Sequence, residues 1–422
     1  MPSTLKNDDD IFFSFSRVSV SFQLNNEMAF KALRALMDTF WIGAENQFPR
    51  TREPVLVREW IRDALYTRTD AYFEKLQNML QTDTISFNEL KDQEEYDARV
   101  QEAYGKGAAW HTPSELFKPY YGESLLKGLD PKGSIYELGP GTGALCESIL
   151  PSFKGSYNLI EVSNALHSVQ RAKFGRHRNV RCHLGYEKVQ RDDGECTVIA
   201  CEVLDNLPHD LIRIEADGSL SQAMVVTNNS ASYRDVPGRY YLEFQPITDP
   251  LIIKYLKVIK SDTKADKWER LVQGAHNIFP EYVYPRNCRF IPTSAFELLS
   301  RLSILFPNAQ LAFFDFDALP DQISLGRTTA PVVQTVYKGE TINCSKLLVK
   351  PGDFDIFFPT DFALLSRMIQ HFWPSHKTNV QKQTTFLQKH ADLQKTTVKN
   401  GFNPLLHTFK NVSVLIATPN PR

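Results

Sequence analysis

The stretch that decides the fold is Ile135-Tyr136-Glu137-Leu138-Gly139-Pro140-Gly141-Thr142-Gly143. It begins with apolar residues typical of a short buried strand, continues with the acid Glu137, and ends in three glycines at alternate positions. Glycine has no Cβ and tolerates positive φ, so the backbone of such a loop can lie directly against a ligand. The following residues, 144–150, are predicted to form a helix whose first N–H groups would face the same ligand.

The spacing of the glycines separates two classes of nucleotide-binding loop. Gly139, Gly141 and Gly143 form G-x-G-x-G, whereas the dinucleotide fingerprint of nicotinamide enzymes is G-x-G-x-x-G. With an acid two residues before the first glycine, the segment resembles motif I of the class I S-adenosylmethionine (SAM) methyltransferases, where the loop holds the methionine part of the cofactor. Three glycines after a strand can also be a tight turn that binds nothing, so a second signal is needed.

The second signal is Tyr157-Asn158-Leu159-Ile160-Glu161-Val162, which is predicted to be another buried strand that ends in an acid. In Rossmann-like folds, a carboxylate at the tip of the neighbouring strand commonly holds a ribose diol. Glu161 could instead be a solvated strand end. Together, the two signals favour a nucleoside-binding site in which Glu137, Gly139, Gly141, Gly143 and Glu161 contact the cofactor.

Composition excludes several other classes of function. The chain of 422 residues has 48 Lys and Arg against 49 Asp and Glu, so no overall field recruits nucleic acid or an anionic membrane. Its six cysteines are scattered, and no metal site is predicted. No apolar run is long enough to span a bilayer. The basic, amphipathic residues 28–37 suit either a mitochondrial presequence or a first helix, and the sequence leaves both open.

Alternating strand and helix patterns predict an α/β fold with a parallel sheet. Strands are expected near 134–138, 157–162, 179–183 and 197–202, and helices near 144–150, 163–173 and 185–190. The predicted regions are a weakly structured extension or targeting segment (1–45), an N-terminal helical region (46–130), the first part of a Rossmann-like core (131–215), an insertion on the substrate side (216–304) and the rest of the core with C-terminal helices (305–422). A hairpin is expected within the insertion, from residues 224–226 and 240–244.

A second acidic cluster follows the fourth predicted strand, in Ala200-Cys201-Glu202-Val203-Leu204-Asp205-Asn206-Leu207-Pro208. Ligands of parallel sheets bind beyond the carboxyl ends of the strands, so Glu202 and Asp205 fall where chemistry is expected. Two acids three residues apart share one face if the loop turns helically. Taken singly, each acid is explained more simply as a cap or a solvated loop residue. As a pair at this place they become candidates for holding a substrate.

The glycine loop, the Leu-Ile-Glu-Val-Ser strand end and the Glu-Val-Leu-Asp-Asn-Leu-Pro segment together resemble the MidA (DUF185) family of SAM-dependent methyltransferases, most closely its fungal members. The resemblance runs from about residue 50 to the C-terminus. Further segments that resemble the family are Thr112-Pro113, Asp315-Phe316, residues 351–356, Thr360-Asp361-Phe362 and Gln383-Thr384-Thr385-Phe386-Leu387. Two residues depart from its pattern: Cys201 stands where Asn or His is common, and Asp317 replaces a glycine.

The MidA family includes a mitochondrial complex I assembly factor that methylates an arginine of a core complex I subunit. The resemblance therefore implies a protein arginine N-methyltransferase that uses SAM and acts on a mitochondrial protein. On this hypothesis Glu202 and Asp205 are the catalytic residues that hold a guanidinium, and Thr112, Pro113 and Asp361 are further substrate-binding candidates. A SAM-binding assembly factor without turnover is the alternative. A nicotinamide-dependent oxidoreductase is a second, weaker alternative. The sequence carries no signal for the oligomeric state.

Overall fold

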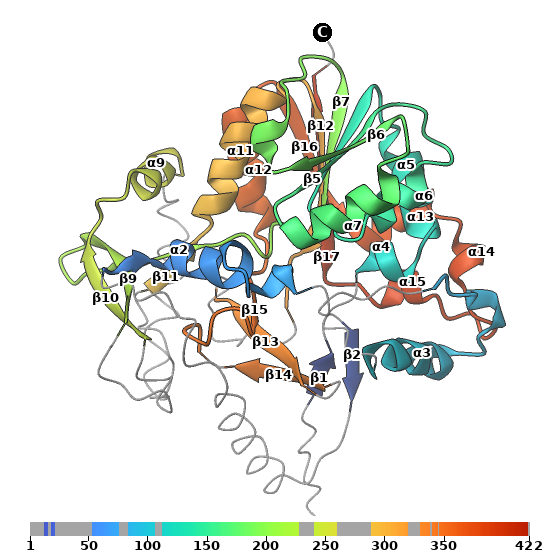
Figure 1. Ribbon diagram of the computed structural model, residues 1–422, viewed down its shortest axis with the longest axis horizontal. Helices are drawn as coiled ribbons and strands as arrows, with labels where there is room; N and C mark the ends of the chain where they lie inside the picture. The colour runs from blue at the N-terminus through green and yellow to red at the C-terminus, as the bar shows by residue number, and fades with distance from the viewer. Residues whose placement is uncertain are drawn as a thin grey trace, which may run out of the picture.

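A seven-stranded sheet forms the centre of the protein (Figure 1). The computed structural model describes residues 12–15, 18–21, 53–75, 83–105, 112–227, 240–259, 288–319, 330–337, 340–344 and 346–420. The amphipathic residues 28–37 lie outside these ranges. The seven strands are β4 (Ser134–Leu138), β5 (Tyr157–Glu161), β6 (Val180–Leu184), β7 (Cys196–Cys201), β12 (Gln310–Phe316), β16 (His376–Lys382) and β17 (Val412–Pro419). Four of them, β4 to β7, are the four predicted parallel strands.

The order of the strands in space is β16-β17-β12-β7-β4-β5-β6. From β4 the chain moves outward to β5 and β6, then crosses back to β7 on the other side of β4 and continues to β12. The pairs β4–β5, β5–β6, β4–β7 and β7–β12 are parallel, whereas β17 runs antiparallel to both of its neighbours. The carboxyl ends of β4 and β7 are therefore the topological switch point, where open α/β sheets bind their ligands.

Helices cover both faces of this sheet, so the core has three layers (Figure 1). The helices against the sheet are α5 (Tyr120–Leu129), α6 (Ala144–Ile149), α7 (Asn164–Phe174), α11 (Thr293–Leu305), α12 (Phe362–Phe372) and α13 (Gln383–His390). Buried side chains of α5, α6 and α13 pack on one face, and those of α11 and α12 pack on the other. The helix expected near 185–190 is only a short 3-10 turn, η5 (Tyr186–Lys188).

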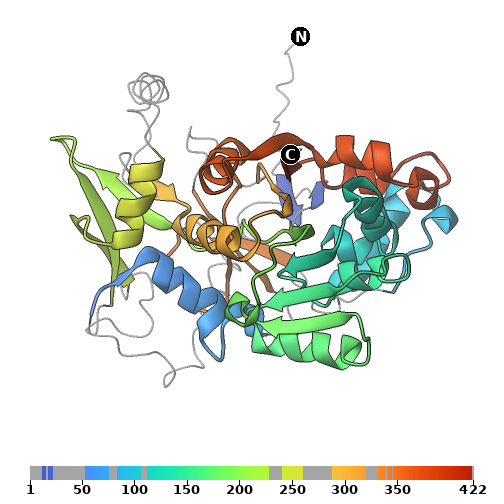
Figure 2. The same cartoon turned by 90° about the horizontal axis from the view of Figure 1, so that it is seen from above.

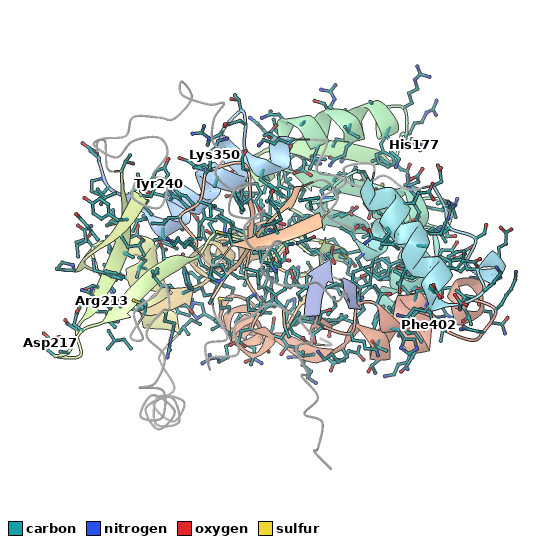
Figure 3. The ribbon with its side chains drawn as sticks, turned by 90° about the horizontal axis from the view of Figure 1, so that it is seen from below. His177, Arg213, Asp217, Tyr240, Lys350 and Phe402 are labelled. Atoms are coloured by element: carbon teal, nitrogen blue, oxygen red, sulfur yellow. The ribbon has the colours of Figure 1, made fainter. Side chains whose placement is uncertain are left out.

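A smaller antiparallel sheet lies at one end of the molecule (Figure 2). Its strands are β3 (Val55–Leu56), β8 (Asp210–Ile214), β9 (Leu220–Thr227), β10 (Tyr240–Pro246) and β11 (Cys288–Ile291). The expected hairpin is present as β9 and β10, with Tyr240 opposite Thr227. Figure 3 shows Arg213, Asp217 and Tyr240 of this sheet region far from His177 and Phe402, which lie at the other end. The small sheet also uses β3 and β8, which lie outside residues 216–304.

An ion network around Arg58 joins the small sheet to the core. Arg58 lies on α2 (Val57–Arg62), is 7% exposed, and donates to Asp210 of β8 at 2.5 Å and to Asp249 at 2.7 and 2.9 Å. Asp249 caps α9 (Pro250–Val258), and Asp210 also accepts the hydroxyl of Thr293 at the start of α11. Removing Arg58 would leave the buried Asp210 without its counter-charge, so this network ties β8 of the small sheet to α2, α9 and α11.

The remaining elements are short or peripheral. They are β1 (Phe12–Phe15), β2 (Val18–Ser21), the π-helical turn η1 (Asp63–Thr67), the 3-10 turns η2 (Tyr72–Glu74) and η4 (Phe87–Glu89), α3 (Gln93–Gly105), α4 (Pro113–Leu116), β13 (Val332–Tyr337), β14 (Glu340–Cys344), β15 (Asp355–Phe357), α14 (Leu393–Thr396) and α15 (Pro404–His407). β13 pairs with β14 and β15 in a three-stranded sheet. Within the described ranges, no helix has the length and apolar character needed to cross a membrane.

Candidate active site at the carboxyl edge of the sheet

The glycine loop leaves β4 with all three glycines at positive φ, namely +57° for Gly139, +57° for Gly141 and +81° for Gly143. A Cβ on Gly139 would lie 2.7 Å from Val203, and one on Gly143 would overlap the ring of Phe174. A Cβ on Gly141 would meet nothing within 4 Å. The outer glycines are therefore required by packing inside the protein, whereas the backbone at Gly141 faces open space that a ligand can occupy.

Glu137 lies inside the sheet, near the end of β4. It is 4% exposed and accepts a hydrogen bond of 2.7 Å from the hydroxyl of Tyr157 on β5. Burial raises the pKa of Glu137 to about 8, so the protonated form of its carboxyl group predominates at neutral pH. The sequence placed Glu137 in contact with the cofactor; here its carboxyl group pairs with Tyr157 inside the sheet, a position from which it can order the glycine loop.

Glu161 ends β5 beside the glycine loop. Its Oε1 accepts the backbone N–H groups of Val162 (2.8 Å) and Ser163 (3.0 Å), and its Oε2 accepts an amide hydrogen of Gln170 (3.1 Å). Burial raises the pKa of Glu161 to about 7. The next side chain, Val162, is 52% exposed, and an exposed apolar side chain at this edge suits a flat, largely apolar base.

A segment from the N-terminal region closes over the start of α7. Glu74 of η2 accepts the backbone N–H groups of Asn164 (2.9 Å) and Ala165 (3.2 Å), and Ser163 caps the N–H of Leu166 at 3.2 Å. The first N–H groups of α7 are thus occupied by side chains of the protein itself. With these donors occupied, the start of α7 is not available to bind an anionic group such as a phosphate.

The acceptor loop, residues 202–206, follows β7 at the other half of the switch point. Glu202 has a φ of +54° and is half-buried, while both oxygens of its carboxyl group are inaccessible to solvent. Asp205 is fully buried. The helical turn from Glu202 that would place both acids on one face is not present, because the left-handed backbone at Glu202 redirects the chain. The two acids are therefore not presented side by side on one helical face.

Asp315, the penultimate residue of β12, anchors the acceptor loop. Its Oδ2 accepts the backbone N–H of Leu204 at 2.8 Å and that of Asp205 at 3.3 Å, and its Oδ1 accepts the N–H of Phe316 at 2.7 Å. A buried carboxylate that satisfies backbone donors of a neighbouring loop fixes that loop in one conformation. Asp315 thus shapes the acceptor loop from the strand beside it.

Asn206 receives contacts from two further segments. Its amide nitrogen donates to Oδ1 of Asp355 at 2.8 Å, and its backbone carbonyl accepts the hydroxyl of Tyr66 at 3.0 Å. Burial raises the pKa of Tyr66, and the carboxylates of Asp355, Asp205 and Glu161 raise it further. The Tyr66 hydroxyl therefore lies in the field of acids from both the acceptor loop and the cofactor strand.

The three remaining candidates lie at helix starts. Thr112 accepts the backbone N–H of Glu115 at 3.3 Å, and Pro113 begins α4. The carboxylate of Glu115 accepts the hydroxyl of Thr142, so α4 is tied to the glycine loop. Asp361 is exposed and caps α12 by accepting a backbone N–H at 2.9 Å. Among the described residues, no cluster of His, Cys, Asp and Glu is arranged to hold a metal ion.

Residues 123–377, more than half of the chain, match the family described as "Putative S-adenosyl-L-methionine-dependent methyltransferase". The chain belongs to this methyltransferase family. Its cofactor is SAM. No functionally curated protein matches the sequence.

Solved structures show the same fold as this methyltransferase. A methyl transferase candidate from Burkholderia thailandensis, bound to S-adenosyl-homocysteine, has a TM-score of 0.57 and 15% sequence identity over 94% of this chain and 95% of that one. An uncharacterized protein of the same superfamily and organism has a TM-score of 0.54 and 15% identity over 94% and 95% of the two chains. The central sheet of the methyltransferase is thus the class I type expected from the sequence.

The residues at the switch point of the methyltransferase fit SAM. The open backbone at Gly141 can receive the amino-acid part, the acid of Glu161 stands at the tip of the adjacent strand, and the exposed Val162 offers an apolar surface for the base. The glycine loop and the acceptor loop also touch, since Val203 packs against Gly139. A cofactor on the glycine loop would therefore lie next to the loop that carries Glu202.

Sequence reasoning missed several members of this site. Gln170 carried a usable signal, because it interrupts the buried stripe of α7 formed by Leu166 and Phe174. Tyr66 and Asn206 carried none, because their contact joins segments 140 residues apart. Asp315 was recognised only through the family resemblance, and its bonds to the acceptor loop required the fold.

Proposed function

We propose that this methyltransferase methylates a guanidinium nitrogen of an arginine side chain in a protein, and that the acceptor is mitochondrial. The observation that carries the proposal is the position of Glu202. It directly follows β7 at the switch point, and the next residue, Val203, packs against Gly139 of the cofactor loop. An acidic side chain adjacent to the cofactor loop suits a cationic acceptor. The MidA-type motifs support arginine and the mitochondrial setting.

Arginine needs acidic partners to become a nucleophile. Its guanidinium stays protonated far above neutral pH, so its nitrogens attack poorly. A carboxylate that bonds to one side of the group draws positive charge toward the nitrogens it touches, which leaves the remaining nitrogen richer in electrons. The two carboxyl oxygens of Glu202 are inaccessible to solvent. Because the dielectric constant is lower away from water, a guanidinium beside them would be attracted more strongly than in solvent.

The backbone of Glu202 supports a functional role. A left-handed φ costs a residue with a side chain roughly 1–2 kcal/mol, and such strain persists where the surroundings impose it, often at active sites. Here the N–H of Glu202 is held by the carbonyl of Phe314 at 2.8 Å. Glu202 is the side chain that would contact the guanidinium. Asp205, more deeply buried in the same loop, would add negative potential behind it.

The other half of the switch point would hold the cofactor. When bound, SAM supplies an electrophilic methyl group on a positively charged sulfur. The backbone at Gly139, Gly141 and Gly143 would receive the amino-acid part, Glu161 would accept a ribose hydroxyl, and Glu137 would order the loop from within the sheet. The protein would accelerate transfer mainly by positioning the nucleophile against the methyl group.

The test is transfer of tritium-labelled methyl groups from SAM by the purified full chain to a protein extract of cells that lack it, followed by hydrolysis and separation of methylated amino acids. We expect label in methylarginine. Glu202→Gln should lower transfer by about 100-fold or more, while S-adenosyl-homocysteine affinity changes less than about threefold. Glu195→Gln, at the exposed opposite end of β7, is the matched control and should transfer normally.

Each other outcome has a distinct meaning. Label in a different amino acid or in small molecules would contradict the arginine acceptor and leave the methyltransferase intact. Cofactor binding without transfer to any acceptor would favour the assembly-factor alternative. A fully active Glu202→Gln enzyme would remove Glu202 from the mechanism.

A further inference from the structure

One buried amide connects the two segments that would hold the cofactor. Gln170 lies on α7 with an exposed fraction of 0%, in line with the buried Leu166 and Phe174 one turn to either side. A polar side chain within an apolar stripe is costly unless its hydrogen bonds are made. The position of Gln170 therefore calls for a function that an apolar side chain could not fulfil.

The bonds of Gln170 lead directly to the cofactor site. Its amide nitrogen donates to the carbonyl of Gly141 at 2.7 Å and to Oε2 of Glu161 at 3.1 Å. Because both partners accept, the amide cannot be turned over without placing its oxygen against them. Its own oxygen is buried and makes no hydrogen bond with the described protein. An apolar residue of similar size, such as methionine, would leave the carbonyl of Gly141 and one oxygen of Glu161 without this donor.

We propose that Gln170 is a positioning residue of the cofactor site, which fixes the peptide group at Gly141 and keeps Glu161 oriented and ionised to accept ribose hydroxyls. One donor group on α7 thereby sets the spacing between the ends of β4 and β5. This inference concerns the cofactor site alone and does not depend on the acceptor being arginine.

The surroundings of Glu161 explain why it needs this donor. Titratable groups face it from three elements, namely Glu74 on η2, Glu137 on β4 and the Tyr66 hydroxyl on η1. Burial and Glu74 raise the pKa of Glu161, whereas the N–H groups of Val162 and Ser163 and the amide of Gln170 lower it. Loss of the Gln170 donor would raise this pKa further, so more of the acid would be protonated at neutral pH and unable to accept a ribose hydroxyl through that oxygen.

The probe is 5′-methylthioadenosine, which keeps the base and ribose of the cofactor but lacks its ionisable amino-acid part. Calorimetric titrations from pH 6 to 8.5 should show that wild-type affinity falls as the pH drops through about 7. In Gln170→Met the midpoint should move up by about one pH unit, which corresponds to about fivefold weaker binding at pH 7. Gln190→Met makes the same chemical change at an exposed site and should match the wild type.

Two further variants make the outcome decisive. Glu161→Gln should bind weakly and without this pH dependence, which identifies the titrating group. Gln170→Lys places a charged donor beside Glu161 and should move the midpoint of binding to lower pH. If Gln170→Met does not fold, the shift in Gln170→Lys tests the proposal in its place. An unchanged midpoint in the folded Gln170 variants, even with weaker binding, would reduce Gln170 to a packing residue and overturn the proposal.

Discussion

The two halves of the active site are built in different ways. On the cofactor side, at the ends of β4 and β5, the side-chain bonds of Glu137 and Gln170 join residues close in sequence: 20 residues separate Tyr157 from Glu137, and 29 separate Gln170 from Gly141. The longest span described on this side is the 91 residues from Glu74 to Ala165 at the start of α7. On the acceptor side, at residues 202–206, the bonds span 111 residues to Asp315, 140 to Tyr66 and 149 to Asp355. A cofactor shared by many enzymes can be held by a local motif, whereas the acceptor loop depends on the whole fold.

The largest effect is expected on the cofactor side, from Gly141→Arg. The new side chain would fill the open space at the glycine loop, so S-adenosyl-homocysteine affinity should fall by more than about 100-fold, or about 3 kcal/mol. Calorimetry measures it. The matched control is Gly218→Arg, because Gly218 has a φ of +83° and equally open surroundings, but lies in the turn between β8 and β9. Equal loss of binding in both variants would attribute the effect to backbone strain.

The next effect tests the acceptor side through Asp315→Ala. The buried N–H groups of Leu204 and Asp205 would lose their acceptor, so the free energy of unfolding should fall by about 2 kcal/mol. Urea unfolding measures this loss, and methyl transfer should fall with it. Asp317→Ala removes the pairing of a more exposed acid with Lys382 and should cost less than about 1 kcal/mol. If Asp315→Ala weakened S-adenosyl-homocysteine binding as strongly as transfer, the two sides would not be separable.

The third prediction concerns Glu137 on the cofactor side and the dependence of the free energy of unfolding on pH. The pKa of Glu137 is raised from 4.5 to about 8, so between pH 5 and 8 the unfolded chain releases a proton that the folded chain keeps. The stability of the wild type should therefore fall as the pH rises, by up to about 1.4 kcal/mol per pH unit from this group. Glu137→Gln lacks this loss, and its stability relative to the wild type should rise with pH.

Urea unfolding at pH 5.5 and pH 8 measures the difference, with Glu195→Gln as the exposed control. A pH-independent difference would show that Glu137 is ionised in the folded protein. It would then be available to contact a cationic part of the cofactor.

The smallest effect is expected from Tyr66→Phe, which removes only the hydroxyl that contacts Asn206. The ring would stay stacked on Phe73, at 5.3 Å between centroids, so stability should fall by about 1 kcal/mol. Transfer should fall several-fold with S-adenosyl-homocysteine affinity unchanged, whereas Tyr241→Phe, at a 44% exposed site, should alter neither. A selective loss of cofactor affinity would assign Tyr66 to the cofactor side.

The same contrast determines how much the sequence could reveal. The glycine loop and the acid of β5 were predicted because their signals lie within a few neighbouring residues. The left-handed φ at Glu202 was not predicted, because left-handed residues other than glycine are uncommon and the sequence around Glu202 carries no turn signal for one. Gln170 interrupts a buried helical stripe in the sequence, but its partners, the carbonyl of Gly141 and the carboxylate of Glu161, became known only from the fold. The acids were recognised, but their degree of burial required the fold.

The position of β17 has a consequence for the synthesis of the protein. Residues 412–419 form a strand inside the main sheet, between β12 and β16. Until this segment leaves the ribosome, the nascent chain exposes an unpaired edge of β12, the strand that carries Asp315. Exposed strand edges invite pairing with other chains, so newly made molecules should depend on chaperones until the last strand is in place.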